Sequence, residues 1–232
     1  MQKPIDKLKI LDVVSIVLLA AATAMVFFYA PMERVMGMVQ KVFYFHVSSA
    51  WAGMLSFILA AVTGGIYLKT ANIKWDILSF AAVEIGIVFA LVAIATGSIW
   101  ARPIWNTWWT WDPRLTTTAI MTLVYVAYLM LRQGLDDPEK SARFGAVYTI
   151  IGALSVPLTF LSIRIFRTIH PVVIGAPSAT SAAFEMAPRM LQTFLFSLLV
   201  WTVVFITLIW HRVRLGTLAH EVEQAKMNME EN

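Results

Sequence analysis

The chain has 232 residues, of which 59% are hydrophobic and 14% are charged, and its formal net charge is +4. This composition excludes an ordinary soluble domain, which carries more charged side chains, and the scattered positive charge forms no patch for nucleic acid. The absence of cysteine excludes disulfides, thiolate metal ligands and a cysteine nucleophile.

Six apolar segments follow one another along the chain and predict an all-α, polytopic integral membrane protein. About 20 apolar residues cross the ~30 Å hydrocarbon layer as a helix, because a bilayer offers no water to unpaired backbone groups. The predicted spans are residues 10–29, 42–68, 77–98, 115–131, 144–163 and 190–210. We expect residues 1–211 to form one six-helix membrane domain and residues 212–232 to form a charged, amphipathic, partly disordered cytoplasmic tail.

The first apolar segment has a competing interpretation as a signal peptide. Ala22, Thr23 and Ala24 resemble a small-residue cleavage site that follows an apolar run. The apolar run continues through Phe28, however, and is longer than the core of a typical signal peptide. An uncleaved first helix is therefore the prediction.

Two spans contain residues that a purely apolar helix does not need. His46 lies near the start of the second span, where a single histidine is more often an interfacial residue than a ligand. Glu84 lies about eight residues into the third span. A carboxylate inside a membrane is costly and is a functional candidate. With no partner evident in the sequence, we expect Glu84 to be a protonated or hydrogen-bonded structural residue.

The segment between the third and fourth spans holds five of the nine tryptophans within residues 100–111. If residues 105–112 form a helix, three of these indoles fall within an arc of about 100° and make one aromatic face. They are Trp105, Trp108 and Trp109. This face is either a platform for a flat, amphipathic ligand or an aromatic belt at the membrane interface.

The same segment ends in Asp112, Pro113 and Arg114. Asp is a favoured N-cap and Pro is favoured at the first helical position, so this pair is predicted to start the fourth span. Arg114 then places a cation in the first turn, against the helix dipole. An anionic ligand group or a phospholipid headgroup is the expected partner of Arg114.

The basic residues predict the orientation of the six spans. With the N-terminus inside, eleven Lys and Arg residues lie in inner segments and seven lie in outer loops, and seven of the eight lysines are inside. This bias favours an N-in, C-in topology. His46, residues 100–114 and His170, which follows the fifth span, are then all on the outer side. Arg164 and Arg167, also just beyond the fifth span, either grip ligand carboxylates or anchor the helix at the headgroups.

Two stretches carry a resemblance to a known family. Residues 97–116, GSIWARPIWNTWWTWDPRLT, closely resemble the WWD signature of the haem-handling proteins of cytochrome c maturation, the CcmC, CcmF and CcsA group. With residues 44–51, YFHVSSAW, and six spans, the chain looks like a member of the CcmC family. The resemblance implies that His46 and His170 are the axial iron ligands of a non-covalent haem b and that the aromatic segment holds the macrocycle. The expected haem contacts are Trp100, Trp105, Trp108, Trp109 and Trp111, with Arg102 and Arg114 at the propionates.

The resemblance also implies a function at the outer face of the bacterial cytoplasmic (inner) membrane. There the protein is expected to present haem to the periplasmic haem chaperone CcmE, with the CcmA and CcmB ATP-driven transporter, and with CcmD, as partners. Two imidazoles fill both axial positions of the iron, which suits a carrier and not a catalyst, so no catalytic residue is predicted. The chain has no Walker A pattern of its own for ATP hydrolysis.

Two alternatives from other classes remain at this stage. One is a haem lyase of the related CcsA type, which is expected to have additional spans and a further pair of membrane histidines that this sequence does not show. The other is a structural membrane subunit whose tryptophans only anchor it at the interface.

Overall fold

A computed structural model describes residues 7–33, 36–171 and 186–230. Lys3 and Arg34, which contribute to the charge count above, lie outside these ranges. The described residues form helices and no β-strand, so the prediction of an all-α protein is confirmed.

The helical elements agree with the six predicted spans. In chain order they are α1 (Lys7–Ala24), η1 (Met25–Tyr29), α2 (Gln40–Thr70), α3 (Ile73–Trp105), α4 (Pro113–Gln133), α5 (Pro138–Gly152), α6 (Ser155–Ile165) and α7 (Pro188–Glu230). Within the described ranges, six helical units are long and apolar enough to cross a membrane, when α1 is taken with η1 and α5 with α6.

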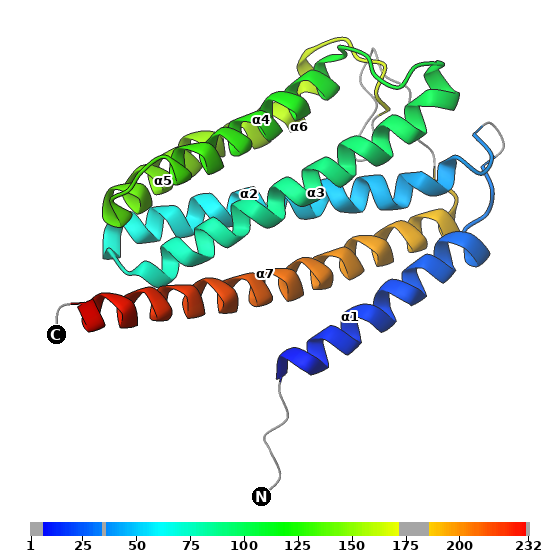
Figure 1. Ribbon diagram of the computed structural model, residues 1–232. Coiled ribbons are helices and arrows are strands. Elements are labelled where there is room, and N and C mark those ends of the chain that lie inside the picture. The colour runs from blue at the N-terminus through cyan, green and yellow to red at the C-terminus, as the bar shows by residue number, and fades with distance from the viewer. Residues whose placement is uncertain (1–6, 34–35, 172–185, 231–232) are drawn as a thin grey trace, which may run out of the picture.

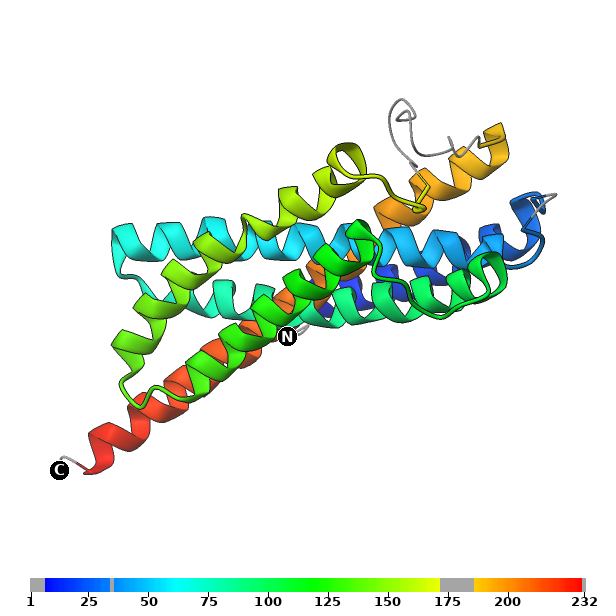
Figure 2. The same cartoon turned by 90° about the horizontal axis from the view of Figure 1, so that it is seen from above.

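An antiparallel hairpin of α2 and α3 lies at the centre of the bundle (Figure 1). The helices α4, α5 and α6 pack on one side of this hairpin, whereas α7 packs on the other side and carries α1. Seen from above, α4 and α7 run obliquely to the hairpin (Figure 2). The start of α2, the end of α3, the start of α4 and the end of α6 therefore meet at one end of the bundle.

Short polar caps set the turns at the opposite end. Ala71 ends α2 in the left-handed conformation, with φ of 50°, and the Asn72 side chain then accepts a hydrogen bond from the Lys74 N–H at the start of α3. Asp137 caps α5 in the same way, by accepting from the backbone N–H groups of Glu139 and Lys140. Such caps satisfy N–H groups that the first helical turn leaves free.

The fifth span is broken into α5 and α6 at residues 153–154. Pro157 has no N–H to continue the helical ladder, and its ring clashes with the carbonyl four residues earlier, that of Ala153. The Ser155 hydroxyl donates to the carbonyl of Gly152 across this break. The sequence predicted a continuous span here, and the proline explains the interruption.

The packing between helices depends on aromatic stacking and on small residues. The rings of Phe57 on α2 and Tyr125 on α4 stack with centroids 3.7 Å apart and planes 4° apart. Gly64 lets α2 approach α5, because a Cβ there would lie 2.6 Å from the Thr149 hydroxyl. Small residues at such crossings are typical of membrane helices, where van der Waals packing drives association.

Two ion pairs join the helices in the half of the bundle away from the α2 start. Arg132 on α4 binds both carboxylate oxygens of Asp76 on α3, at 2.6 and 2.9 Å. Arg212 on α7 lies 2.6 Å from Glu84 on α3. Both guanidinium groups lie over the Phe80 ring. Glu84 therefore has a charged partner, which the sequence reading missed because the partner is 128 positions away in the chain.

The prediction of a partly disordered tail is wrong for residues 212–230. They continue α7, a single helix of 43 residues. At 1.5 Å per residue this helix is about 65 Å long, roughly twice the hydrocarbon thickness. Residues 221–229 contain Glu, Gln, Ala, Lys and Met, which are strong helix formers, so charge there does not prevent helix formation.

Candidate functional site

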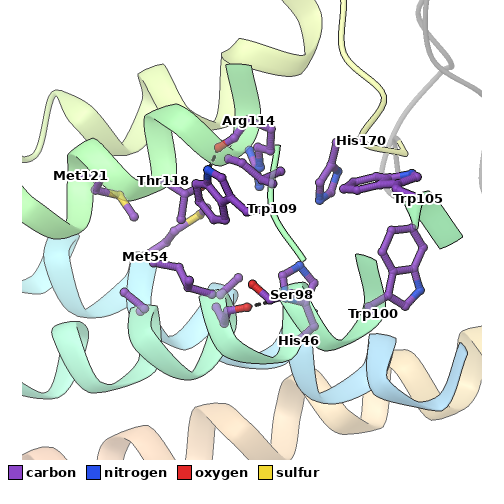
Figure 3. A pocket seen from close by; sticks show the side chains of 17 residues that line it. His46, Met54, Ser98, Trp100, Trp105, Trp109, Arg114, Thr118, Met121 and His170 are labelled. Atoms are coloured by element: carbon purple, nitrogen blue, oxygen red, sulfur yellow. Dashed lines mark hydrogen bonds between the residues drawn. The ribbon is translucent and has the colours of Figure 1, made fainter. Parts of the chain in front are cut away.

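A cavity lies at the end of the bundle where α2 begins and α3 ends (Figure 3). Small and apolar residues line most of it, together with two histidines and one arginine. The lining residues are His46, Ala50, Gly53 and Met54 of α2; Ala90, Ala93, Ile94, Gly97, Ser98, Trp100 and Trp105 of α3; Trp109; Arg114, Leu115, Thr118 and Met121 of α4; and His170.

His46 lies in the second turn of α2, and its ring is held against α3. The His46 Nδ1 is 2.9 Å from the carbonyl oxygen of Ala93. A carbonyl only accepts, so this contact places a proton on Nδ1, and in the neutral imidazole the lone pair is then on Nε2. An imidazole whose second nitrogen donates to a backbone carbonyl is the usual arrangement of a metal-binding histidine.

His170 has the same arrangement without a helix around it. Its Nδ1 lies 3.0 Å from the carbonyl oxygen of Pro171, which again leaves Nε2 with its lone pair. Desolvation by the surrounding protein lowers the pKa of His170 to about 3, and the nearby Arg114 and His46 act in the same direction. The imidazole is therefore neutral at physiological pH, which is the form that binds a metal.

The two imidazoles face each other across the cavity (Figure 3). Their ring centroids are 6.4 Å apart and their planes are inclined by 43°. Metal–imidazole bonds of about 2.0–2.1 Å on both sides of one ion place two such centroids roughly 6.3 Å apart. The structure brings these two histidines together at one end of the bundle, and the distance between their ring centroids fits a single metal ion between them.

Residues 105–112 do not form a helix, so the single aromatic face that a helix would have given them is absent. The helix α3 ends at Trp105, because Asn106 adopts the left-handed conformation with φ of 54°. Asparagine tolerates this conformation better than most residues and is a common helix terminator. The Thr107 hydroxyl then donates to the carbonyl of Trp109 and closes a turn.

Because the helix ends at Trp105, the five tryptophans fall into two groups. Trp100, Trp105 and Trp109 line the cavity, and Trp105 packs edge to face against His170 with ring centroids 6.5 Å apart. Trp108 and Trp111 are 58% and 79% exposed and do not line it. Any contact of these two indoles with a bound ligand is therefore made from outside the cavity.

Arg114 is the arginine that lines the cavity. Its guanidinium donates to the carbonyl oxygen of Thr159 at 2.6 Å and lies over the Phe160 ring. In the part of the chain that the structure describes, no ion pair involves Arg114. A half-buried cation that forms no ion pair within the described residues suits the anionic group of a ligand.

Three other arginines near this end of the bundle do not line the cavity. Arg102 is exposed in the last turn of α3 and donates to the Asn106 side chain. Arg164, in the last turn of α6, and Arg167, just beyond it, are also exposed and do not line the cavity.

Asp112 starts α4 as predicted, with Pro113 at the first helical position and the Asp112 Oδ1 accepting from the Arg114 N–H at 2.9 Å. The sequence did not reveal a second set of contacts. The buried Asp112 carboxylate also accepts hydrogen bonds from the hydroxyl of Thr168 and from the N–H of Ile169, 56 and 57 residues further along the chain. In the sequence, the only hint of these contacts is that Thr168 stands two residues before the candidate ligand His170.

Comparison of the sequence with known protein families gives a match that includes all of these residues. A model of the family described as Heme exporter protein C matches residues 5–228. The chain belongs to the CcmC family. Because the match covers nearly the whole chain, the histidines, the tryptophan-rich segment and all six helical units lie within the CcmC region.

Individual CcmC relatives show how far the similarity extends. Heme exporter protein C of Bradyrhizobium diazoefficiens is 31% identical over 194 residues, which is 83% of this chain and 70% of that protein. Heme exporter protein C of Escherichia coli K12 is 32% identical over 69% of this chain and 65% of the relative. A putative cytochrome c biosynthesis ccmC-like mitochondrial protein of Marchantia polymorpha is 30% identical over 66% of this chain and 64% of its own length.

Gly97 is a further residue of this CcmC family member that the sequence did not single out. A Cβ at Gly97 would lie 2.9 Å from Cε1 and 3.1 Å from Nδ1 of His46. A Cβ essentially never sits under 3.0 Å from another heavy atom, so a side chain at this position displaces the imidazole. The displacement weakens the hydrogen bond between His46 and Ala93.

On the hypothesis that His46 binds haem iron, Gly97→Ala is expected to lower the affinity for haem by about 10- to 100-fold, the usual cost of losing a contact that orients a metal ligand. Titration of purified protein with haem, followed by absorption, measures this effect. Gly65→Ala is the matched control, because a Cβ there meets only Ile150, at 3.9 Å. Equal affinities of the two variants would contradict the prediction.

Proposed function

We propose that this protein binds haem between His46 and His170 at the outer face of the cytoplasmic membrane and presents it to the haem chaperone CcmE during cytochrome c maturation. The observation that carries the proposal is the pair of imidazoles with ring centroids 6.4 Å apart, each with its Nδ1 within hydrogen-bond distance of a backbone carbonyl oxygen. Membership of the CcmC family supports a role in haem handling.

The remaining cavity residues fit the chemistry of a porphyrin. The small and apolar side chains between α2, α3 and α4 suit the apolar edge of the porphyrin. Three indoles suit stacking against the porphyrin ring: Trp100, Trp105 and Trp109. Arg114 is the candidate to pair with a propionate, as a charge-assisted hydrogen bond. Three of the expected haem contacts lie outside the cavity: Arg102, Trp108 and Trp111. They suit contact with a part of the haem that projects from the cavity, or with haem during its transfer to an acceptor.

This ligand set favours a carrier over an enzyme. Two histidine ligands leave the haem iron no open position for a substrate. We propose CcmE as the acceptor, with CcmA, CcmB and CcmD as the other members of the export system. The printed names of the relatives describe haem exporters and, for the Marchantia protein, cytochrome c biosynthesis.

An absorption spectrum of the purified full-length protein, oxidised and reduced, tests the proposal directly. Expression with a haem supply is expected to yield a non-covalently bound, six-coordinate, low-spin haem that acid and organic solvent extract. A preparation without a Soret band would contradict haem binding and favour the alternative, a structural membrane subunit. Maturation of a Cys-x-x-Cys-His reporter by this chain alone would favour the haem lyase instead.

The outer placement of the cavity has its own test, because the chain contains no cysteine. Met38 is 56% exposed beside the start of α2, and Asp136 is exposed in the loop between α4 and α5, at the other end of the bundle. In spheroplasts, Met38→Cys is expected to react with a membrane-impermeant maleimide, whereas Asp136→Cys reacts only after lysis. The reverse pattern would place the cavity on the cytoplasmic side.

A further inference from the structure

The two candidate iron ligands are held in different ways. His46 belongs to α2, and its ring is bonded to α3, so the central hairpin fixes its position. His170 lies beyond the end of α6 at Ile165, in a segment without helical hydrogen bonds. The position of the second ligand therefore depends on contacts made by its own short segment.

Apolar burial does little to hold this segment. The side chains of Ile165, Phe166 and Ile169 are 62%, 50% and 54% exposed. Thr168, in contrast, is only 4% exposed and points to the start of α4. Among the described residues, the polar contacts of Thr168 and of its backbone neighbours therefore restrain the segment, together with the packing of the His170 ring against Trp105.

These contacts form a relay from Asp112 to the backbone of His170. The Thr168 Oγ1 lies 2.7 Å from each carboxylate oxygen of Asp112, and its single proton is shared between them. The Ile169 N–H donates to Asp112 Oδ2 at 2.9 Å. The His170 N–H in turn donates to the Thr168 Oγ1 at 3.0 Å. Three hydrogen-bond contacts in which the buried Asp112 and Thr168 take part converge on residues 168–170, so this relay is a firm restraint.

We propose that Asp112 is a positioning residue for the second haem ligand: through Thr168 it latches His170 over the cavity. This inference rests on the proposed function, because it assigns a role to residues that contact the ligand His170 and not the haem itself. With haem held between the two histidines, release of these contacts would let His170 withdraw from the iron while the hydrogen bond to Ala93 kept His46 in place. The haem would then be open to an acceptor on the His170 side.

The same carboxylate also caps α4, so the test must separate the two roles. Thr168→Val removes the hydroxyl of the relay, keeps the shape of the side chain and leaves the cap of α4 intact. Thr168→Ser keeps the hydroxyl. Asp112→Asn retains an oxygen for the cap, but its amide nitrogen cannot accept from the Ile169 N–H.

The readout is the spin state and affinity of haem bound to the purified full-length variants. Wild type and Thr168→Ser are expected to be six-coordinate and low-spin. Thr168→Val, and more weakly Asp112→Asn, are expected to shift toward five-coordinate, high-spin haem, with affinity lowered about 10- to 100-fold. Free imidazole is expected to restore the low-spin spectrum. Asp137→Asn, which alters the cap of α5 at the other end of the bundle, is the matched control and should behave as wild type.

The outcomes separate this inference from the function on which it rests. A Thr168→Val spectrum and affinity equal to wild type would overturn the latch and leave the haem-binding proposal intact. A five-coordinate spectrum that free imidazole fails to change would also overturn it, since the open position would then not be that of His170. A wild-type protein without low-spin haem would remove the proposed function itself.

Discussion

Replacing both His46 and His170 with alanine is expected to abolish the six-coordinate haem spectrum of the purified protein. The two imidazoles have centroids 6.4 Å apart, and both line the cavity. The single variant His170→Ala is expected to keep a five-coordinate haem on His46, because α2 and α3 still hold that ring. Absorption and magnetic circular dichroism spectra of the three variants provide the measurement.

The other two histidines supply matched controls. His211 lies 2.6 Å from Asp12 and His220 follows it on α7, in the part of that helix remote from the cavity. Replacing either with alanine should leave the haem spectrum unchanged. A low-spin spectrum that survives in the double variant of His46 and His170 would refute the assignment of both ligands.

Removing the buried carboxylate of Asp76 is expected to cause the largest loss of stability. Asp76→Ala leaves the guanidinium of Arg132, whose side chain is 14% exposed, without its bidentate partner. Breaking a buried ion pair from one side costs about 3–5 kcal/mol, because the remaining charge stays desolvated. Unfolding by denaturant in mixed micelles, followed by circular dichroism, measures the change in the free energy of unfolding.

Two further variants show whether the lost charge partner is the cause. Lys140→Ala removes one member of the exposed pair with Asp137 and should leave the free energy of unfolding unchanged. Asp76→Leu combined with Arg132→Met removes both charges and is expected to recover much of the loss. A single variant of Asp76 as stable as wild type would show that the pair does not stabilise the bundle.

Much of the fold followed from local chemistry. Apolar segments of span length predict membrane helices, since a bilayer forces each segment to satisfy its own backbone. The start of α4 was predictable because an N-cap is a contact between neighbours, here Asp112 and the N–H of Arg114. The break at residues 153–154 follows from Pro157, although the apolar pattern around it conceals the break.

The site was predictable only in part. The alternation of spans across a membrane brings His46, His170 and the tryptophan-rich segment to one end of the bundle, because each helix reverses the direction of the chain. The arrangement of the indoles was not predictable, since the left-handed Asn106 turned the segment out of its helix and left Trp108 and Trp111 exposed. The latch between Asp112 and Thr168 joins two loops whose relative placement is set by helices α4 and α6.

The sequence by itself therefore determined the class of protein, its six helical units and the residues that gather at one end. Only the tertiary structure decided which of those residues meet: the spacing of His46 and His170, the glycine that admits the His46 ring, and the pairing of Glu84 with Arg212. The physical reason is range. Hydropathy and capping act between residues that are near in the chain, whereas a ligand site or a buried ion pair depends on distances between helices, which the packing of the whole bundle sets.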